Sequence, residues 1–370
     1  MSWPPTAEQQ TVIDHDISRN ARILAGPGTG KSATVIRLML RLGDAGKKGR
    51  ILTFTRAATN ELKEKVAEHT EVLDQPSTVH SFAISTLLAN PGSSGLPEPI
   101  RISDDWEWKE LIRVHLGNLM NCNVHLIKRA SAEMASNWQS LAEFEDPDLP
   151  ADIRNRFAGA WEQHRRIFGY SLLSELPFRL LRALEDHADL QLGRWEFLVV
   201  DEYQDLNQCD LSVLKQITYR GRALIGAGDD DQSIYSFRRA HPNGIRRFVE
   251  DDYPGADDHK LSISQRCATS ILDWARHVIE GLPGRPLRPP LTAAAHCLPG
   301  DARYLRFNGW NQEVDGVARL VLWLTETKGV HLENLYRRTL AINFHSADGL
   351  VEVQIDSFLP LGSPSACPIV

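Results

Sequence analysis

One glycine-rich segment constrains the fold of this 370-residue chain more than any other feature. The segment reads Ala25-Gly26-Pro27-Gly28-Thr29-Gly30-Lys31-Ser32. It follows the apolar run 21–24 and precedes a stretch in which apolar residues recur at helical spacing up to residue 42. A strand, a tight loop and a helix in this order are typical of a phosphate-binding loop in a parallel α/β sheet. The alternative is a glycine-rich turn that binds no ligand.

The loop residues predict how a nucleotide is held. Gly28 and Gly30 let the backbone curl so that its N–H groups face phosphate oxygens, next to the positive end of the helix. Lys31 is expected to reach the β- and γ-phosphates, and Ser32 offers a hydroxyl ligand for Mg²⁺. The common form of this motif has glycine at the position of Ala25, but the curl depends on the two later glycines.

A second motif follows the apolar run 197–200, which predicts a buried strand. Asp201 and Glu202 stand at its carboxyl end, where open α/β sheets bind ligands. Asp201 suits the Mg²⁺ shell, and Glu202 suits a base that orients and deprotonates water. Taken alone, the pair is equally consistent with an acidic loop, and the phosphate-binding loop favours the catalytic interpretation.

A third motif, residues 228–238, follows another predicted strand at 223–226. Gln232 lies where its side chain can hydrogen-bond a γ-phosphate. Tyr235 and Phe237 are either platforms on which bases stack or aromatic residues of the core. The acidic run 229–231 is interpreted as a solvated turn at Asp230 rather than a metal site.

The pattern of elements predicts an α/β domain with a helical insert. Strand signals are sparse from 91 to 190, so the α/β domain is expected at 1–90 and 191–255. A Tyr-Pro-Gly break ends at Gly255, a further region is expected at 256–370, and a helix is expected over 314–328. Residues 357–370 show no periodic pattern.

Composition limits the environment and the partners. No run of about 18 apolar residues exists, and the N-terminus lacks a basic and apolar leader, so we expect neither a membrane span nor secretion. Five scattered cysteines suit a reducing cytoplasm. The net charge of −7 argues against a basic coat for nucleic acid but allows one local groove.

Seven segments, in order, resemble the motifs of superfamily 1 DNA helicases of the UvrD/Rep type. They are Gln9 within 6–10 (Q motif), 25–32 (motif I), 53–58 (Ia), 78–82 (Ib), 201–205 (II), 228–238 (III) and 261–267 (IV). The resemblance covers residues 6–275 well and 301–342 weakly. It implies a RecA-like P-loop NTPase domain and, from residue 256, an incomplete second RecA-like domain with an irregular tail.

The resemblance also implies site residues and ligands. ATP is the implied substrate, with Mg²⁺; Gln9 would read adenine, and Arg266 would approach the γ-phosphate. Single-stranded DNA is the implied partner. Its implied contacts are Phe54, Arg56, His80, Tyr235 and Phe237. For His80 a purely structural role remains the alternative.

The implied activity is ATP-dependent translocation on single-stranded DNA and unwinding of tailed duplex DNA in the 3′-to-5′ direction. Two departures from the family pattern bear on it. Gln265 stands where many members have an aromatic residue that stacks on adenine, and motifs V and VI find no match. The alternatives are an ATP- and DNA-binding module without unwinding activity and a regulatory fragment that acts with a partner subunit.

Overall fold

The computed structural model describes residues 4–66, 75–233, 243–280, 288–300, 303–327, 329, 340–343 and 351–355. The chain divides into two compact units. One unit comprises Met1–Ala25 and Lys31–Leu261, and the other comprises Gly26–Gly30 and Ser262–Val370. The first unit contains a large parallel sheet and a group of helices. The second contains the glycine-rich loop and two smaller sheets.

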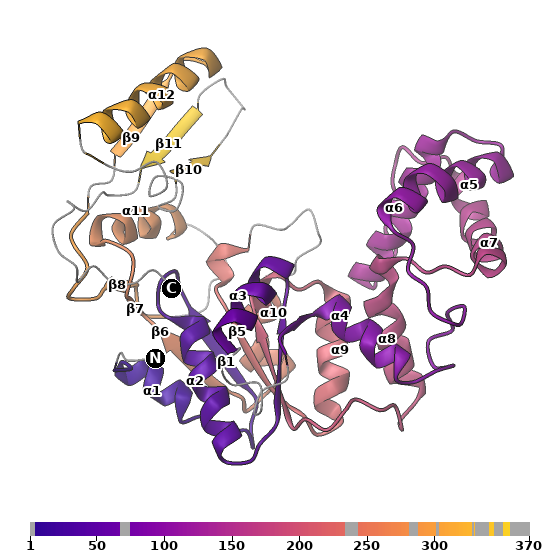
Figure 1. Cartoon of the computed structure of the whole chain (residues 1–370), viewed down its shortest axis with the longest axis horizontal. Coiled ribbons are helices and arrows are strands. Elements are labelled where there is room, and N and C mark those ends of the chain that lie inside the picture. The colour runs from indigo at the N-terminus through magenta and orange to yellow at the C-terminus, as the bar shows by residue number, and fades with distance from the viewer. Residues whose placement is uncertain are drawn as a thin grey trace. The chain divides into compact units, whose positions relative to one another are not determined.

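A six-stranded parallel sheet forms the centre of the first unit (Figure 1). Its strands are β1 (Ala21–Ala25), β2 (Gly49–Thr53), β3 (Ser77–Thr78), β4 (Phe197–Asp201), β5 (Ala223–Gly228) and β6 (Asp257–Leu261), in the order β3-β2-β4-β5-β1-β6. Every residue of β1 and β4 is buried, as expected for strands covered on both faces. The predicted α/β class with a parallel sheet is confirmed. Because β4, β5 and β1 are neighbours and run parallel, the segments that follow these three strands leave the same edge of the sheet.

Helices cover both faces of this sheet. They are α1 (Ala7–Ile13), α2 (Lys31–Asp44), α3 (Arg56–Val66), α4 (Val79–Leu88), α9 (Gln208–Tyr219) and α10 (Asn243–Arg246). The apolar residues of α2, such as Val35 and Leu38, share one core cluster with Ile23 of β1 and Val199 of β4. A second cluster joins α4 and α9 to other strand residues. The apolar spacing after the glycine-rich loop therefore places α2 against the sheet.

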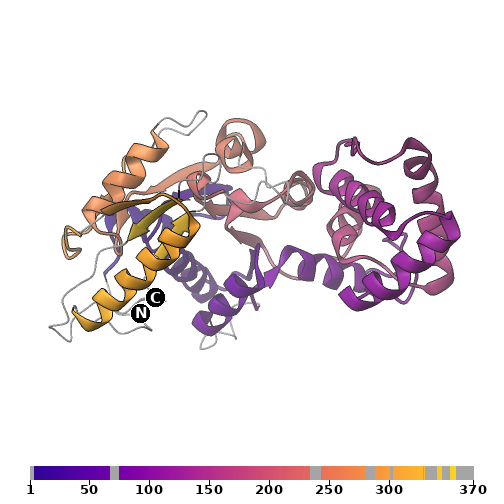
Figure 2. The ribbon, with the colours of Figure 1, turned by 90° about the horizontal axis from the view of Figure 1, so that it is seen from above.

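The helical segment expected at 91–190 is present. It contains a π-helical turn (Glu107–Ile112), α5 (Arg113–Met120), α6 (Val124–Ser140), α7 (Ala151–Phe168), a 3₁₀ turn (Leu173–Glu175) and α8 (Leu176–Asp186). Figures 1 and 2 show α5, α6 and α7 gathered in one group. These helices have a core of their own, which includes Leu116, Ile127 and Trp161. Leucines of α8 instead join the core beside the sheet.

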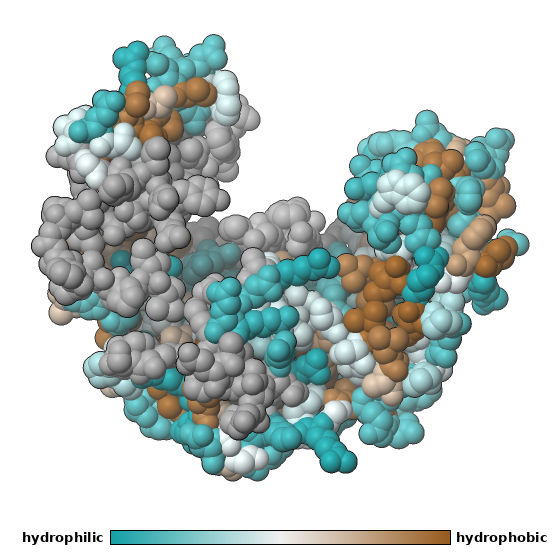
Figure 3. All heavy atoms as spheres, viewed as in Figure 1, coloured by the Kyte–Doolittle hydropathy of each residue, from teal (hydrophilic) through white to brown (hydrophobic). Residues whose placement is uncertain are grey.

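Hydrophobic side chains also reach the surface of this segment. Brown spheres gather in Figure 3 over the part of the chain that contains α5 to α8. Exposed residues there include Leu119, Ile167 and Phe168. Among the residues with a described structure, no helix combines the length and the apolar character needed to span a bilayer.

The first sheet extends beyond the Tyr-Pro-Gly break. Strand β6 pairs in parallel with β1, from Ala21 opposite Asp257 to Ala25 opposite Leu261. Buried Arg22 on β1 donates from Nε to Asp258 at 2.8 Å and also contacts Glu250 at 3.1 Å. The expectation that residues after 255 belong to a second domain is therefore wrong for β6, because pairing and buried charges keep that strand in the first sheet.

The second unit contains shorter elements. Its strands are β7 (Ile263–Ser264), β8 (Thr292–Ala293), β9 (Arg303–Phe307), β10 (Leu340–Asn343) and β11 (Val351–Ile355), and its helices are α11 (Thr269–Ile279) and α12 (Trp310–Glu326). β7 pairs with β8, and the other three strands form an antiparallel sheet in the order β10-β11-β9. The helix expected over 314–328 corresponds to α12. The tail at 357–370 lies outside the described residues.

Candidate active site

The glycine-rich loop connects β1 to α2 and is held by the segment that follows β6. Gly28 has a φ of +72°, and a Cβ there would lie 2.6 Å from Oγ of Ser264 and 2.8 Å from Cβ of Arg266. Ser264 Oγ donates to the carbonyl of Pro27 at 2.9 Å, and the backbone N–H of Gln265 donates to the carbonyl of Gly28 at 2.7 Å. Only glycine fits this conformation and this close approach. The predicted site residue Arg266 therefore lies beside the loop.

Lys31, the first residue of α2, lies between two carboxylates. Its Nζ atom is 3.0 Å from Oδ1 of Asp201 and 2.7 Å from Oε2 of Glu202. Burial alone would lower the pKa of Lys31, but the charge of Asp201, and then that of Glu202, outweighs burial and raises this pKa. Lys31 therefore remains an ammonium ion, and it compensates two negative charges that would otherwise repel each other.

Ser32 and Asp201 provide the oxygen atoms that suit a magnesium ion. Ser32 Oγ donates to Asp201 Oδ2 at 3.4 Å, so the hydroxyl and carboxylate oxygens converge although their residues are far apart in the sequence. Hydroxyl and carboxylate oxygens are hard ligands, which Mg²⁺ prefers. The two residues thus fit the ion that accompanies a bound nucleoside triphosphate.

Glu202 adopts a strained backbone conformation directly after β4. Its φ of +55° and ψ of +45° lie in the left-handed region, which costs a residue with a side chain about 1–2 kcal/mol. Its N–H donates to Asp201 Oδ1 at 3.0 Å, and its carbonyl accepts from the N–H of Asp205, also at 3.0 Å. Strain of this kind gathers at functional sites. Here it turns the chain sharply after β4 and brings the carboxylate of Glu202 to Lys31.

Gln204 connects Glu202 to the end of β5. Its Nε2 donates to Oε2 of Glu202 at 2.9 Å, and its Oε1 accepts from the backbone N–H of Asp229 at 3.1 Å. Asp229 Oδ2 in turn accepts from Nε2 of Gln232 at 2.7 Å. A continuous chain of hydrogen bonds therefore joins Glu202, the predicted base, to Gln232, the predicted γ-phosphate contact. Sequence reasoning did not select Gln204, although it stands two residues after Glu202 in the second motif.

Gly228, the last residue of β5, allows Gln204 to approach. A Cβ at Gly228 would lie 2.3 Å from Oε1 of Gln204 and 3.2 Å from the backbone nitrogen of Tyr203. Close contact therefore requires glycine at this position. A positive φ is not the reason, because Gly228 does not have one. This steric requirement is not visible in the sequence.

Asp230 is buried and paired, which corrects the interpretation of a solvated turn. Its side chain is fully buried, and its Oδ2 atom lies 2.9 Å from Nε of Arg246 at the end of α10. The short helix α10 follows the third motif and brings a guanidinium back to the aspartate. The sequence could not reveal this pairing because the partners are 16 residues apart.

Gln9 lies in the first turn of α1 and takes part in a capping box. Its Oε1 accepts from the N–H of Thr6 at 2.8 Å, and Thr6 Oγ1 accepts from the N–H of Gln9 at 3.2 Å. The side chain of Gln9 is buried. The cap explains why this glutamine is held rigidly, and its role toward adenine remains a prediction.

The predicted DNA contacts have different surroundings. Phe54 follows β2 and packs, partly buried, against the hydrophobic core. Arg56 begins α3 and is exposed. His80 lies in the first turn of α4, whose cap is the side chain of Thr78. Tyr235 and Phe237 lie outside the described residues. The role of all five in DNA binding therefore remains a prediction.

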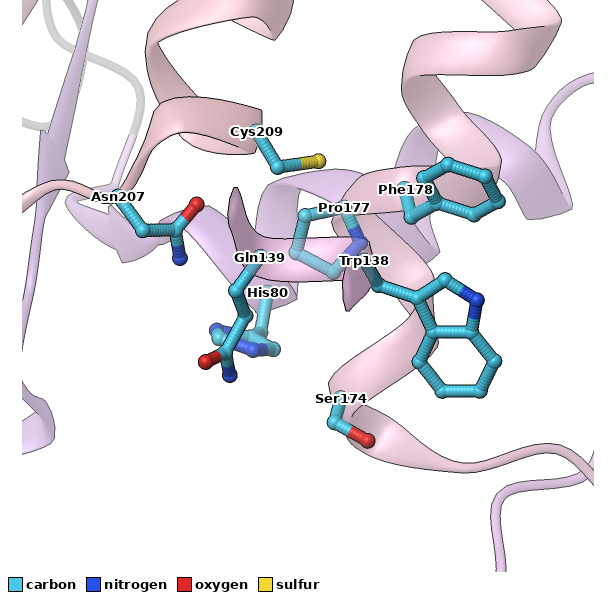
Figure 4. A pocket seen from close by; sticks show the side chains of 8 residues that line it. All are labelled: His80, Trp138, Gln139, Ser174, Pro177, Phe178, Asn207 and Cys209. Atoms are coloured by element: carbon cyan, nitrogen blue, oxygen red, sulfur yellow. The ribbon is translucent and has the colours of Figure 1, made fainter. Parts of the chain in front are cut away.

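A pocket beside His80 is formed by α4, the helical segment and the start of α9 (Figure 4). Its lining residues are His80, Trp138, Gln139, Ser174, Pro177, Phe178, Asn207 and Cys209. The rings of Trp138 and Phe178 are stacked, with centroids 6.3 Å apart. His80 is thus placed next to the helical segment, with aromatic and polar side chains around it.

The fold and these side chains have the arrangement of a P-loop protein: a glycine-rich loop between β1 and α2, a lysine at the start of α2, and an Asp-Glu pair after β4. The sequence model of the UvrD/REP helicase N-terminal domain matches residues 5–253. The chain therefore belongs to the UvrD/Rep helicase family, as the resemblance of its motifs predicted.

Individual relatives are similar over 70–74% of the chain. The chain is 26% identical over 278 residues to the ATP-dependent DNA helicase PcrA of Leuconostoc citreum, covering 70% of this chain and 36% of the relative. It is 26% identical over 278 residues to the ATP-dependent DNA helicase Rep of Escherichia coli strain K12, covering 70% and 41%. A probable DNA helicase II homolog of Mycoplasma capricolum is 27% identical over 299 residues, covering 74% and 40%. The chain spans about two fifths of the length of these relatives.

Proposed function

We propose that this chain binds ATP together with Mg²⁺ and hydrolyses ATP in a reaction stimulated by single-stranded DNA. The observation that carries the proposal is the cluster in which Lys31 contacts both Asp201 and Glu202. Phosphoryl transfer in P-loop proteins uses a lysine after the glycine-rich loop together with carboxylates for the metal and the water, and here these groups lie in direct contact. PcrA and Rep, the relatives described above, are named ATP-dependent DNA helicases.

Each side chain of the site has a proposed task. Lys31 exchanges its carboxylate partners for the β- and γ-phosphates, while Ser32 and Asp201 hold the metal. Glu202 orients the attacking water and accepts its proton. Mg²⁺, when bound with the nucleotide, neutralises the charge that develops on the phosphates. Gln9 is proposed to read adenine.

Arg266 is proposed to stabilise the transition state of ATP hydrolysis. This exposed side chain stands beside the loop, because its Cβ would lie 2.8 Å from a Cβ on Gly28. An arginine close to the γ-phosphate compensates charge in the transition state, and its loss in phosphoryl-transfer enzymes costs about 10³-fold or more.

DNA is proposed to act on the site through the hydrogen-bond chain that runs from Gln232 to Glu202. Phe54, Arg56 and His80 are the proposed contacts on the first unit, and Tyr235 and Phe237 complete the set. A bound DNA strand that moves the segment carrying Gln232 also shifts Asp229 and Gln204. It thereby shifts the base, Glu202. Hydrolysis and strand movement are then coupled, which is the basis of translocation.

We extend the proposal to translocation in the 3′-to-5′ direction and to unwinding of tailed duplex DNA. The second candidate function is an ATP- and DNA-binding module that hydrolyses ATP weakly and does not unwind. The observation that favours it is the length of the match: the chain spans about two fifths of its helicase relatives. Unwinding is named for those longer proteins.

Strand displacement with the purified chain separates the two candidates. The substrates are one duplex with a 3′ single-stranded tail and the same duplex with a 5′ tail, each with ATP and Mg²⁺. Displacement from the 3′-tailed duplex alone supports the helicase. Binding of the tail with ATP hydrolysis and no displacement supports the module. Failure to bind single-stranded DNA at low salt contradicts both.

A further inference from the structure

Two histidines and one aspartate meet at the β6 edge of the six-stranded sheet. His15 follows α1, and Asp257 and His259 lie on β6. The Nδ1 atom of His15 is 3.2 Å from Oδ2 of Asp257 and 3.4 Å from Nε2 of His259. Asp257 and His259 are two residues apart on one strand, so their side chains leave the same face. None of the three belongs to the proposed ATP or DNA site.

The hydrogen bonds around His15 determine which of its nitrogens faces the cluster as an acceptor. Its Nε2 is 3.1 Å from the carbonyl oxygen of Arg19, which can only accept, so Nε2 carries the proton. In a neutral imidazole the lone pair is then on Nδ1, which points at a carboxylate oxygen. Two acceptors in contact repel each other, and either a proton or a metal cation between them removes the repulsion.

Burial disfavours a proton between the two atoms. His15 is only 4% exposed, and a buried imidazolium is disfavoured because it loses its hydration. The guanidinium of Arg19 already lies 2.9 Å from Oδ1 of Asp257, which orients the carboxylate and leaves Oδ2 for the cluster. Metal-binding histidines commonly donate their other N–H to a backbone carbonyl, as His15 does to Arg19.

The spacing of the three side chains fits a tetrahedral metal. With bonds of about 2.0–2.1 Å, neighbouring ligand atoms of a tetrahedral zinc site lie about 3.3 Å apart. The distances of 3.2 and 3.4 Å agree with this value, and all three ligand atoms lie within 4.8 Å of one another. Imidazole suits Zn²⁺ and related transition metals, whereas Mg²⁺ and Ca²⁺ prefer oxygen ligands only.

We propose that His15, Asp257 and His259 bind one Zn²⁺-like divalent transition metal, with water as the fourth ligand. The side chain of Asp257 is 26% exposed, which gives solvent access to that position. The metal joins the segment after α1 to the edge strand β6. The same segment is also fixed by Arg41, which donates to the carbonyls of Ile13 and His15. The role of the metal is therefore structural, and it holds the helix that carries Gln9 against the sheet.

The test titrates Zn²⁺ alone into the full chain after treatment with a chelator, in excess Mg²⁺ so that the Asp201 region is saturated. We expect one Zn²⁺ per chain with micromolar or tighter affinity, and a rise of at least about 3 °C in Tm at saturating metal. His259→Gln, at a half-buried position, should weaken binding at least about 10-fold and remove the rise in Tm. His125→Gln, at an exposed position of α6, is the matched control and should bind Zn²⁺ like the unmodified chain.

Asp257→Asn provides a second variant in case His259→Gln does not fold. It keeps the size of the side chain and removes its charge, so it should also weaken Zn²⁺ binding while retaining the far-ultraviolet circular dichroism of the unmodified chain. Co²⁺ substitution should give the visible absorption of a tetrahedral site with nitrogen and oxygen ligands. Equal Zn²⁺ affinity in the unmodified chain and both variants, absence of binding, or a thiolate charge-transfer band with Co²⁺ would overturn the proposal.

Discussion

The side-chain amide of Gln204 donates to the carboxylate of Glu202 at 2.9 Å, so the predicted base of the site is held by a residue of the turn that follows it. The same amide accepts from the N–H of Asp229 at 3.1 Å. One side chain thus connects the ends of β4 and β5. The position of the base therefore depends on the segment after β5, where the third motif begins.

Replacement of Lys31 by alanine should abolish ATP hydrolysis and weaken nucleotide binding. The change removes the only charge that compensates both Asp201 and Glu202 among the ion pairs of the described residues. Lys47→Ala is the matched control, because Lys47 forms one exposed ion pair with Glu196, and such pairs contribute about 0–1 kcal/mol. Single-turnover hydrolysis and nucleotide titration measure both effects. Unchanged single-turnover hydrolysis in Lys31→Ala contradicts the assignment of the loop.

Replacement of Glu202 by glutamine should leave ATP binding intact and lower turnover by about 10²-fold or more. Glutamine keeps the size of the side chain and can still bond to Gln204, but it cannot accept a proton from water. Glu196→Gln, at an exposed carboxylate, should leave both quantities unchanged. If Glu202→Gln neither binds ATP nor folds, the residue is structural instead.

Replacement of Gln204 by leucine should reduce the stimulation of ATP hydrolysis by DNA more than basal hydrolysis. Leucine fills the same space but breaks both hydrogen bonds, and it leaves the buried N–H of Asp229 without this acceptor. An unsatisfied buried group costs about 1–3 kcal/mol, so Tm should also fall. Gln191→Leu, in an exposed loop, is the control. The ratio of turnover with and without single-stranded DNA is the measurement, and an unchanged ratio excludes the proposed connection.

Replacement of Asp210 by asparagine should stabilise the protein more at pH 8 than at pH 5. Burial raises the pKa of Asp210 from 3.8 to about 7, although the hydrogen bond from the N–H of Asn207 opposes the shift. The folded chain therefore binds more protons than the unfolded chain between these values, and the free energy of unfolding falls as pH rises through this window. Asparagine does not ionise, so the variant does not undergo this fall in the free energy of unfolding.

Guanidinium unfolding of the unmodified chain and of Asp210→Asn at both pH values provides the comparison. The gain in unfolding free energy should be about 1–3 kcal/mol larger at pH 8 than at pH 5. Asparagine keeps an acceptor for Asn207, so the cap of α9 is preserved. An equal gain at both pH values would show that Asp210 is ionised in the folded chain throughout.

The sequence predicted the elements whose signals are local. β1, β4 and β5 are short apolar runs, and α2 has apolar residues at helical spacing, so burial determines both their type and their place. The sequence also predicted that Lys31 and Asp201 lie close together, because the carboxyl ends of parallel strands meet at one edge of a sheet.

The parts that could not be predicted depend on contacts between distant residues. The Tyr-Pro-Gly break predicts a domain boundary before β6, whose sequence, Asp-Asp-His-Lys-Leu, carries three charged side chains and has no continuous apolar run. The place of β6 is determined by pairing with β1 and by the ion pair between Arg22 and Asp258, which no local pattern reveals. No local pattern reveals the fit of Gln204 and Gly228 either, since it depends on a close approach between the turn after β4 and the end of β5.

The most direct test of the account is steady-state ATP hydrolysis by the purified chain, measured with and without a single-stranded oligonucleotide at low salt. The unmodified chain should hydrolyse ATP in the presence of Mg²⁺ and should do so faster with DNA. Lys31→Ala and Glu202→Gln should lose this activity, while Lys47→Ala and Glu196→Gln retain it. Hydrolysis that persists unchanged in Lys31→Ala, or that shows no response to DNA in the unmodified chain, would contradict the account.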